Sequence, residues 1–155
     1  MHFYLEGHHC QCPLQGYVVA NQKFAKAHPD LTQRVVKALL KAAQWATDET
    51  NHEAIIKLWG SAGSIPEYVY RQEYQGFPLS NKLSPLFDPF IVARTQQSID
   101  DAYTYKLIRH KFDAESWIDR SYLNAALKEL KLENNWPQFD RNGAVLKEAS
   151  KQRPS

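Results

Sequence analysis

The sequence of 155 residues lacks several features that would indicate a function directly. Its 19 basic and 17 acidic residues nearly balance, and the formal net charge of +2 makes no strong electrostatic case for binding nucleic acid or an anionic membrane. Apart from residues 147–153, the basic residues are dispersed along the chain. Lys or Gln interrupts the longest apolar stretches, so we expect no membrane insertion. The composition excludes collagen and low-complexity disorder, which leaves one globular domain or a large piece of a two-domain protein.

The N-terminal segment also lacks the features of an export signal. Residues 1–7 contain neither a basic region nor an apolar core, so we expect no signal peptide in this chain. Cysteine is scarce, since only Cys10 and Cys12 occur, and a disulfide between them would close a very small, strained ring. These two residues therefore point to metal or thiol chemistry rather than to an oxidising compartment.

The clearest regular element is a helix that begins at residues 29–30, because Pro at the first helical position followed by Asp is a helix start signal. Apolar side chains recur there at spacings of three and four, which predicts one buried face. We expect the helix to end near Ala46, because the polar residues 48–51 break the pattern. The predicted buried face comprises Leu31, Val35, Leu39, Ala42, Ala43 and Ala46.

The rest of the chain is also predicted to be mainly helical, with about five helices in all. The only strand candidate is the β-rich run at residues 17–20, whereas residues 1–16 are predicted to be a loop. Glycines at positions 60 and 63 are expected to end a helix, and residues 76–82 are expected to form a loop. We predict that residues 134–155 form a polar tail that lies loosely on the surface. The four other main helices are expected at 53–59, 67–74, 88–108 and up to about 130, and residues 21–28 are a candidate for a further short helix.

The densest polar cluster is His8, His9, Cys10 and Cys12. Imidazole and thiolate groups together suit transition metals such as zinc, copper or iron. The ligand spacing is tighter than in a standard structural zinc site. Three interpretations remain: a transition-metal or thiol site, a polar loop that lines a cleft, and a loop without a special role. Otherwise we expect no cofactor.

Several short segments, in their order along the chain, resemble a known family. These segments are 17–20, 24–31, 37–46, 71–79, 96–108 and 122–127, so the resemblance covers roughly residues 17–130. Together they are similar to the aliphatic sulfonate/nitrate-type solute-binding proteins of ABC importers, a superfamily that includes the thiamine pyrimidine synthases.

The resemblance implies an α/β fold, the type II periplasmic-binding-protein clamshell, with the ligand held between two lobes. This chain corresponds to the mainly helical C-terminal half, with residues 17–133 as the shared part. It implies that the other half supplies the sheet and most ligand contacts. A full-length member would be periplasmic or tethered outside the cell, and its partners would be a small anionic ligand and an ABC permease.

The resemblance also suggests where a ligand would contact this chain. Gln15 and Tyr17 lie at the implied crossing between the lobes, and Arg71 and Tyr74 lie in the loop that follows a helix. The planar guanidinium of Arg71 offers a fork of donors that suits a sulfonate or a carboxylate. The function predicted first is therefore a binding module rather than an enzyme.

Two alternatives remain. The segment Cys10–Cys12 resembles the end of the cysteine-rich cluster of thiamine pyrimidine synthases, which implies a metal-dependent enzyme of that kind that uses the His/Cys loop. The sequence departs from that family in having His8 and His9 where the family has cysteines. In the other alternative, a second copy of the chain covers the apolar faces that the missing half would cover, because exposed apolar surface drives association.

Overall fold

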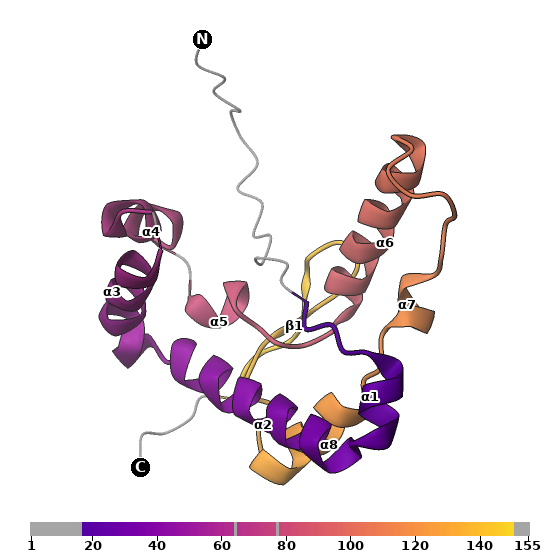
Figure 1. The fold of residues 1–155 in the computed structure, drawn as a ribbon. Helices are drawn as coiled ribbons and strands as arrows, with labels where there is room; N and C mark the ends of the chain where they lie inside the picture. Colours follow the sequence, from indigo (N-terminus) through magenta and orange to yellow (C-terminus); the bar gives the residue numbers. More distant parts are fainter. Residues whose placement is uncertain (1–16, 64, 77, 151–155) are drawn as a thin grey trace.

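The computed structural model describes residues 17–63, 65–76 and 78–150, which are mostly helical (Figure 1). The two strands of the described residues, β1 (Gln138–Phe139) and β2 (Val145–Lys147), form a small antiparallel hairpin with a register irregularity at Gln138/Phe139. A 3-10 turn, η1, covers Glu49–Asn51. The α-helices are α1 (Gln22–Ala27), α2 (Pro29–Ala46), α3 (His52–Ala62), α4 (Glu67–Glu73), α5 (Leu79–Lys82), α6 (Pro89–Thr104), α7 (Ala114–Trp117) and α8 (Ser121–Leu130).

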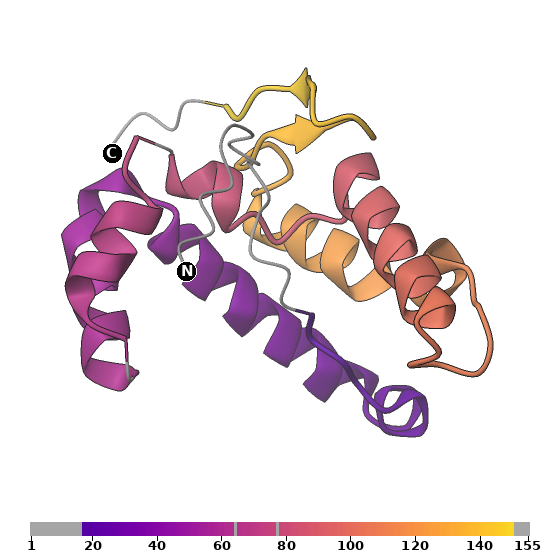
Figure 2. The same cartoon turned by 90° about the horizontal axis from the view of Figure 1, so that it is seen from above.

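Helix α2 connects two groups of helices (Figures 1 and 2). At its C-terminal end, α3 packs against α4 to form one arm. Helices α6 and α7 pack together and form a second arm, while α8 packs along α2. The hairpin contacts α6 through β1. The described residues are mainly helical, as predicted, and contain one small hairpin, while the α/β clamshell stays a prediction.

The start signals in the sequence correctly predict where α2 and α6 begin. The carboxylate of Asp88 accepts a hydrogen bond from the Ile91 amide at 2.9 Å, and Pro89 follows it at the first helical position of α6. Asn21 caps α1 and Asp113 caps α7 in the same way. Each cap satisfies an amide that has no partner inside its helix.

The predicted buried face of α2 is correct at Ala43 and Ala46, which are half-buried against the two apolar clusters, and is wrong by about one residue at its other positions. Leu31, Val35 and Leu39 are largely exposed, whereas the residues that follow each of them, Thr32 and Leu40 most clearly, face the core. The sequence contains two adjacent apolar stripes at helical spacing, and contact with α8 selects one of them. The buried or half-buried stripe is Thr32, Val36, Leu40 and Ala43.

Four other predictions also differ from the structure. Residues 17–20 form no strand, because no described strand lies beside them, and Val18 and Val19 remain 69% and 71% exposed. The expected loop 76–82 contains α5, and α6 ends at Thr104 rather than 108. Gly60 does not end its helix but lies within α3, where a Cβ atom would lie 2.4 Å from the Glu67 side chain. Glycine at this position therefore allows α4 to approach α3.

The segment after residue 133 is not a loose tail. Trp136 is fully buried, with 0% exposure, in the main apolar cluster. Its indole Nε1 donates to Thr47 Oγ1 at 3.0 Å, and Thr47 Oγ1 donates to the Ala43 carbonyl at 2.8 Å. The described part of the segment thus carries a central core residue. The rest of this cluster is Leu40, Leu86, Ala126, Leu127 and Leu132.

Asp88 holds the hairpin against the start of α6. One carboxylate oxygen caps α6, and the other accepts from the Phe139 amide of β1 at 3.0 Å. At the hairpin turn, Gly143 has a φ of +86°, which favours glycine, and a Cβ atom there would lie 3.3 Å from the Phe90 ring. Both contacts fix the hairpin on α6.

A second apolar cluster joins α3, α4 and α5, and it includes Ile55, Ile56, Tyr74 and Leu79. Trp59 packs on Tyr74 with ring centroids 5.1 Å apart. Burial, together with the negative charge of Glu73 and the neighbouring Tyr70, raises the pKa of Tyr74 to about 12. The fold therefore favours the protonated phenol.

We expect Thr47→Val to lower the free energy of unfolding by about 1–3 kcal/mol, because the buried Trp136 N–H loses its acceptor. Urea unfolding measures the change. Thr104→Val is the matched control, since Thr104 makes the same bond to a carbonyl four residues earlier but at an exposed site. In a Trp136→Phe background, Thr47→Val should cost clearly less. Equal losses at positions 47 and 104 would contradict the role of Thr47.

We expect stability to fall at alkaline pH through Tyr74. Because its pKa is raised in the fold, its stabilising contribution is complete below about pH 10 and is lost as the pH rises to about 12. Tyr74→Phe should remove this part of the pH dependence in chemical unfolding measured from pH 8 to 12. The exposed Tyr68 gives the control, since Tyr68→Phe should leave the alkaline loss intact. Identical pH profiles for wild type and Tyr74→Phe would contradict this assignment.

Candidate functional site

The predicted ligand contacts do not meet in the described part of the chain. Arg71 and Tyr74 lie at α4, in the first arm, whereas Tyr17 packs against α6 and α7 in the second. Gln15 lies outside the described residues, as do the predicted metal ligands His8, His9, Cys10 and Cys12.

Arg71 lines an open hollow of about 490 Å³ between α3 and α4. Its Nη1 donates to both carboxylate oxygens of Glu53, at 2.5 and 2.7 Å, and its Nη2 lies 3.4 Å from Glu67. The hydrogen bonds to Glu53 raise the pKa of Arg71 and lower that of Glu53. An anion that binds Arg71 in this hollow must compete with Glu53. The other lining residues are His52, Ile56, Tyr68, Gln72, Gln75 and Gly76.

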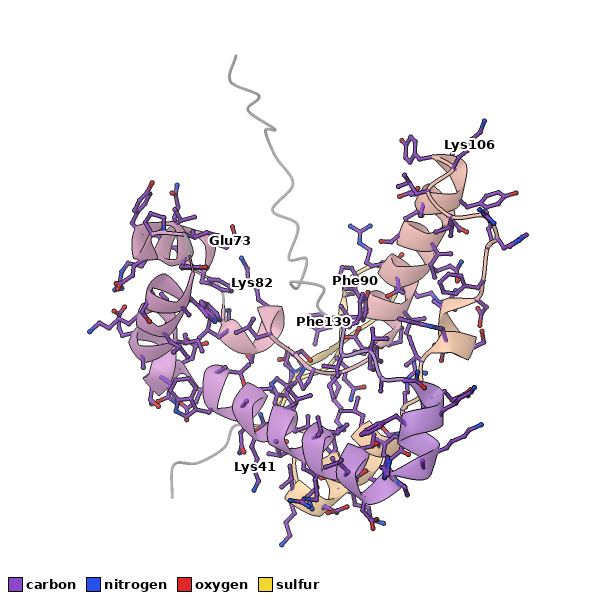
Figure 3. All side chains as sticks on the ribbon, in the orientation of Figure 1. Lys41, Glu73, Lys82, Phe90, Lys106 and Phe139 are labelled. Atoms are coloured by element: carbon purple, nitrogen blue, oxygen red, sulfur yellow. The ribbon has the colours of Figure 1, made fainter. Side chains whose placement is uncertain are left out.

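Tyr74 lies in the second apolar cluster, beside an unusually buried cation. Lys82 is 8% exposed, and its ammonium group lies 5.0 Å from the centre of the Tyr74 ring. The same ammonium donates to the Glu73 carbonyl at 2.5 Å and pairs with the Glu73 carboxylate at 3.4 Å. Figure 3 shows Lys82 of α5 close to Glu73 of α4. Sequence spacing gave no indication of Lys82, because its nearest charged contact is nine residues away.

Tyr17 is held by an aromatic wall on the second arm. Its hydroxyl lies 2.6 Å from Thr95 Oγ1, a buried group that in turn donates to the Ile91 carbonyl. The Tyr17 ring stacks on Phe87, with centroids 6.5 Å apart, and meets Trp117 edge-on at the same distance. Tyr17 is thus a well-positioned aromatic side chain at the start of the described chain.

A second open hollow, of about 420 Å³, lies between α8 and the start of α6. Leu86, Phe87, Leu123 and Leu127 give it apolar walls. Arg120 in this hollow donates to the Phe87 carbonyl at 3.3 Å and to Glu115 at 2.9 Å. The hollow is lined by charges of both signs, since Asp88 and Glu133 offset Arg120 and Lys128. The sequence contains no motif that brings these residues together.

The described ranges give no support for a metal site or for a membrane-spanning helix. No group of three or more His, Cys, Asp or Glu side chains in residues 17–63, 65–76 and 78–150 could hold a metal ion. In the same residues, no helix has the length and apolar character needed to cross a membrane.

No protein-family model matches the chain. It is 24% identical over 114 residues to the "Putative aliphatic sulfonates-binding protein" of Bacillus subtilis (strain 168). This match covers 74% of this chain and 33% of the relative. It is also similar to the crystal structure of the "putative sulfonate ABC transporter, periplasmic sulfonate-binding protein SsuA" from Methylobacillus flagellatus KT. That match has a TM-score of 0.72 and 30% identity, and covers 78% of this chain and 37% of the other.

These matches confirm the resemblance predicted from the sequence. The chain spans about a third of the length of each of these two relatives. Both relatives are named as binding proteins, not as enzymes. Over roughly three quarters of its length, this chain is therefore similar to part of the sulfonate-binding proteins of ABC transporters.

Proposed function

We propose that this chain forms part of the solute-binding component of an ABC importer for a small anionic compound such as an aliphatic sulfonate. The observation that carries the proposal is the match to the sulfonate-binding SsuA structure at 30% identity and a TM-score of 0.72 over 78% of the chain. Identity and backbone agreement at this level over most of the chain support a common function as well as a common fold.

The chain matches only part of each relative, which supports a specific role for it within a larger protein. The chain spans about a third of the two relatives, and its described residues contain only a two-stranded hairpin. We propose that it contributes the helical, C-terminal part of a two-lobed clamshell, whose other segments supply the large sheet. A permease receives the ligand, and the complete protein acts in the periplasm or tethered outside the cell.

Two of the predicted contacts fit a ligand-binding role by different means. Tyr17 offers a fixed ring and a hydroxyl bonded to Thr95, so it can line a binding cleft without rearrangement. Arg71 can bind the anionic head in competition with Glu53, which holds its Nη1 group. Tyr74 contributes indirectly, because its ring lies in the cluster that supports the arm. Gln15 remains a proposed contact next to Tyr17.

We expect calorimetric titration to show saturable binding of an alkanesulfonate, tighter than that of a carboxylate with the same chain length. The titration is performed on the complete protein of the source cell that contains this chain. Sequencing the coding DNA on both sides of the chain defines that protein. Absence of sulfonate binding to that protein would overturn the proposed function.

Arg71→Gln should weaken sulfonate binding about tenfold or more, because a hydrogen bond to a charged group contributes roughly 1.5–3 kcal/mol. Glu53→Gln should strengthen binding, since it frees the guanidinium. The matched control is Arg34→Gln, at an exposed position of α2. Unchanged affinity in Arg71→Gln and Glu53→Gln, with normal binding by the wild type, would exclude Arg71 as a ligand contact and leave the proposed function intact.

A further inference from the structure

Helix α2 carries a second apolar stripe beside the one that packs against α8. We call it the outer stripe, and its four large side chains are 44% to 48% exposed. Figures 1 and 2 show α8 along one side of α2, and Figure 3 shows Lys41, at the edge of the outer stripe, pointing away from the described chain. The outer stripe comprises Leu31, Val35, Ala38, Leu39, Ala42 and Trp45, all of them exposed.

The two stripes of α2 face in different directions. Leu31, Val35 and Leu39 each directly precede a residue of the stripe that packs against α8, and successive residues of a helix point about 100° apart. A surface helix of a globular protein has one apolar stripe, which faces the core, and a polar face opposite it. Because α2 has two apolar stripes, its sequence suits a helix that is buried on two sides.

The described residues provide a neighbour for only one of the two stripes. Helices of an α/β protein cover the faces of a sheet, whereas the sheet of the described residues is a two-stranded hairpin that contacts α6 through β1. The chain spans 33% and 37% of the two relatives that it matches. The unmatched two thirds of a relative is long enough to supply a sheet for the outer stripe.

A second copy of α2 is a poor partner for the outer stripe. Residues 31–46 contain three basic residues and no acidic residue, since Asp30 and Asp48 lie beyond the ends of the stripe. Arg34 and Lys41, at the edge of the stripe, form no ion pair with a described residue. In an antiparallel pair centred on the stripe, Arg34 of one copy would lie close to Lys41 of the other. Like charges that meet in this way disfavour an interface.

We propose that the outer stripe packs on the apolar face of a β-sheet, supplied by segments of the complete protein that lie outside this chain. Leu31, Val35 and Leu39 contact the sheet, and Arg34 and Lys41 reach carboxylates at its rim. Helix α2 then lies between this sheet and α8, which accounts for both of its stripes. The inference rests on one premise of the proposed function, that this chain is part of a larger solute-binding protein.

The first test is thiol labelling of the complete native protein, in a background where serine replaces Cys10, Cys12 and any other cysteine. Leu39→Cys is compared with Val145→Cys on β2, because Leu39 and Val145 are almost equally exposed in this structure, at 44% and 51%. We expect the thiol at position 39 to react roughly tenfold more slowly or more, since a reagent reaches a covered thiol only during local opening. Equal rates would overturn the proposal.

The second test identifies what covers the outer stripe. Lys41→Cys places a thiol at the exposed edge of the stripe, where a benzophenone maleimide can be attached. We expect photo-cross-links within the same molecule to peptides outside residues 1–155 that have the alternating apolar pattern of strands. Cross-links confined to residues 1–155, to a helical segment or to a second molecule would overturn the proposal, as would coding DNA that encodes no further segment.

Neither test uses a sulfonate, so the two proposals can fail separately. A covered outer stripe in a complete protein that binds no sulfonate would overturn the proposed function and leave this inference intact. An outer stripe that labels freely in a protein that binds sulfonate would overturn only this inference.

Discussion

The hydrogen bond between Trp136 and Thr47 is the contact on which the described fold most depends. It joins the C-terminal segment to the end of α2, and it lies in the cluster that α2 and α8 share. An indole N–H can be buried fully only where an acceptor is available, and the Thr47 hydroxyl both accepts from it and donates to α2. Because Trp136 is buried in this cluster, the C-terminal segment belongs to the core although most of its residues are polar. The hairpin that follows is then held on α6 by Asp88.

This arrangement leaves two arms, each with its own means of support. The first arm relies on the aromatic cluster around Tyr74 and on the buried ammonium of Lys82. The second relies on capped helix starts and on the packing of Tyr17 against Phe87 and Trp117. The candidate ligand contacts are divided between the arms, so they do not form one site in this chain. That division agrees with a chain that matches about a third of each of two sulfonate-binding relatives.

For charged side chains too, the neighbours in space matter more than the net charge of the chain. Glu53 neutralises Arg71, which the sequence marked as the best anion contact. Arg34 and Lys41, which no motif singled out, lie exposed on α2 without an ion pair among the described residues. A side chain's availability for an anion depends on its neighbours in space, because a charge already paired must give up one partner to gain another.

The sequence by itself determined where helices such as α2 and α6 begin and which family the chain resembles. Caps such as Asp88 and prolines such as Pro89 act within a few residues, so they can be recognised without the fold. Tertiary structure decided which stripe of α2 is buried, why Gly60 lies inside a helix, and that Trp136 belongs to the core. It also decided that residues 17–20 form no strand and that Arg71 is paired with Glu53. The partners are 18 residues apart in the Arg71–Glu53 contact and 89 residues apart in the Trp136–Thr47 contact, and local spacing carries no information about partners at such separations.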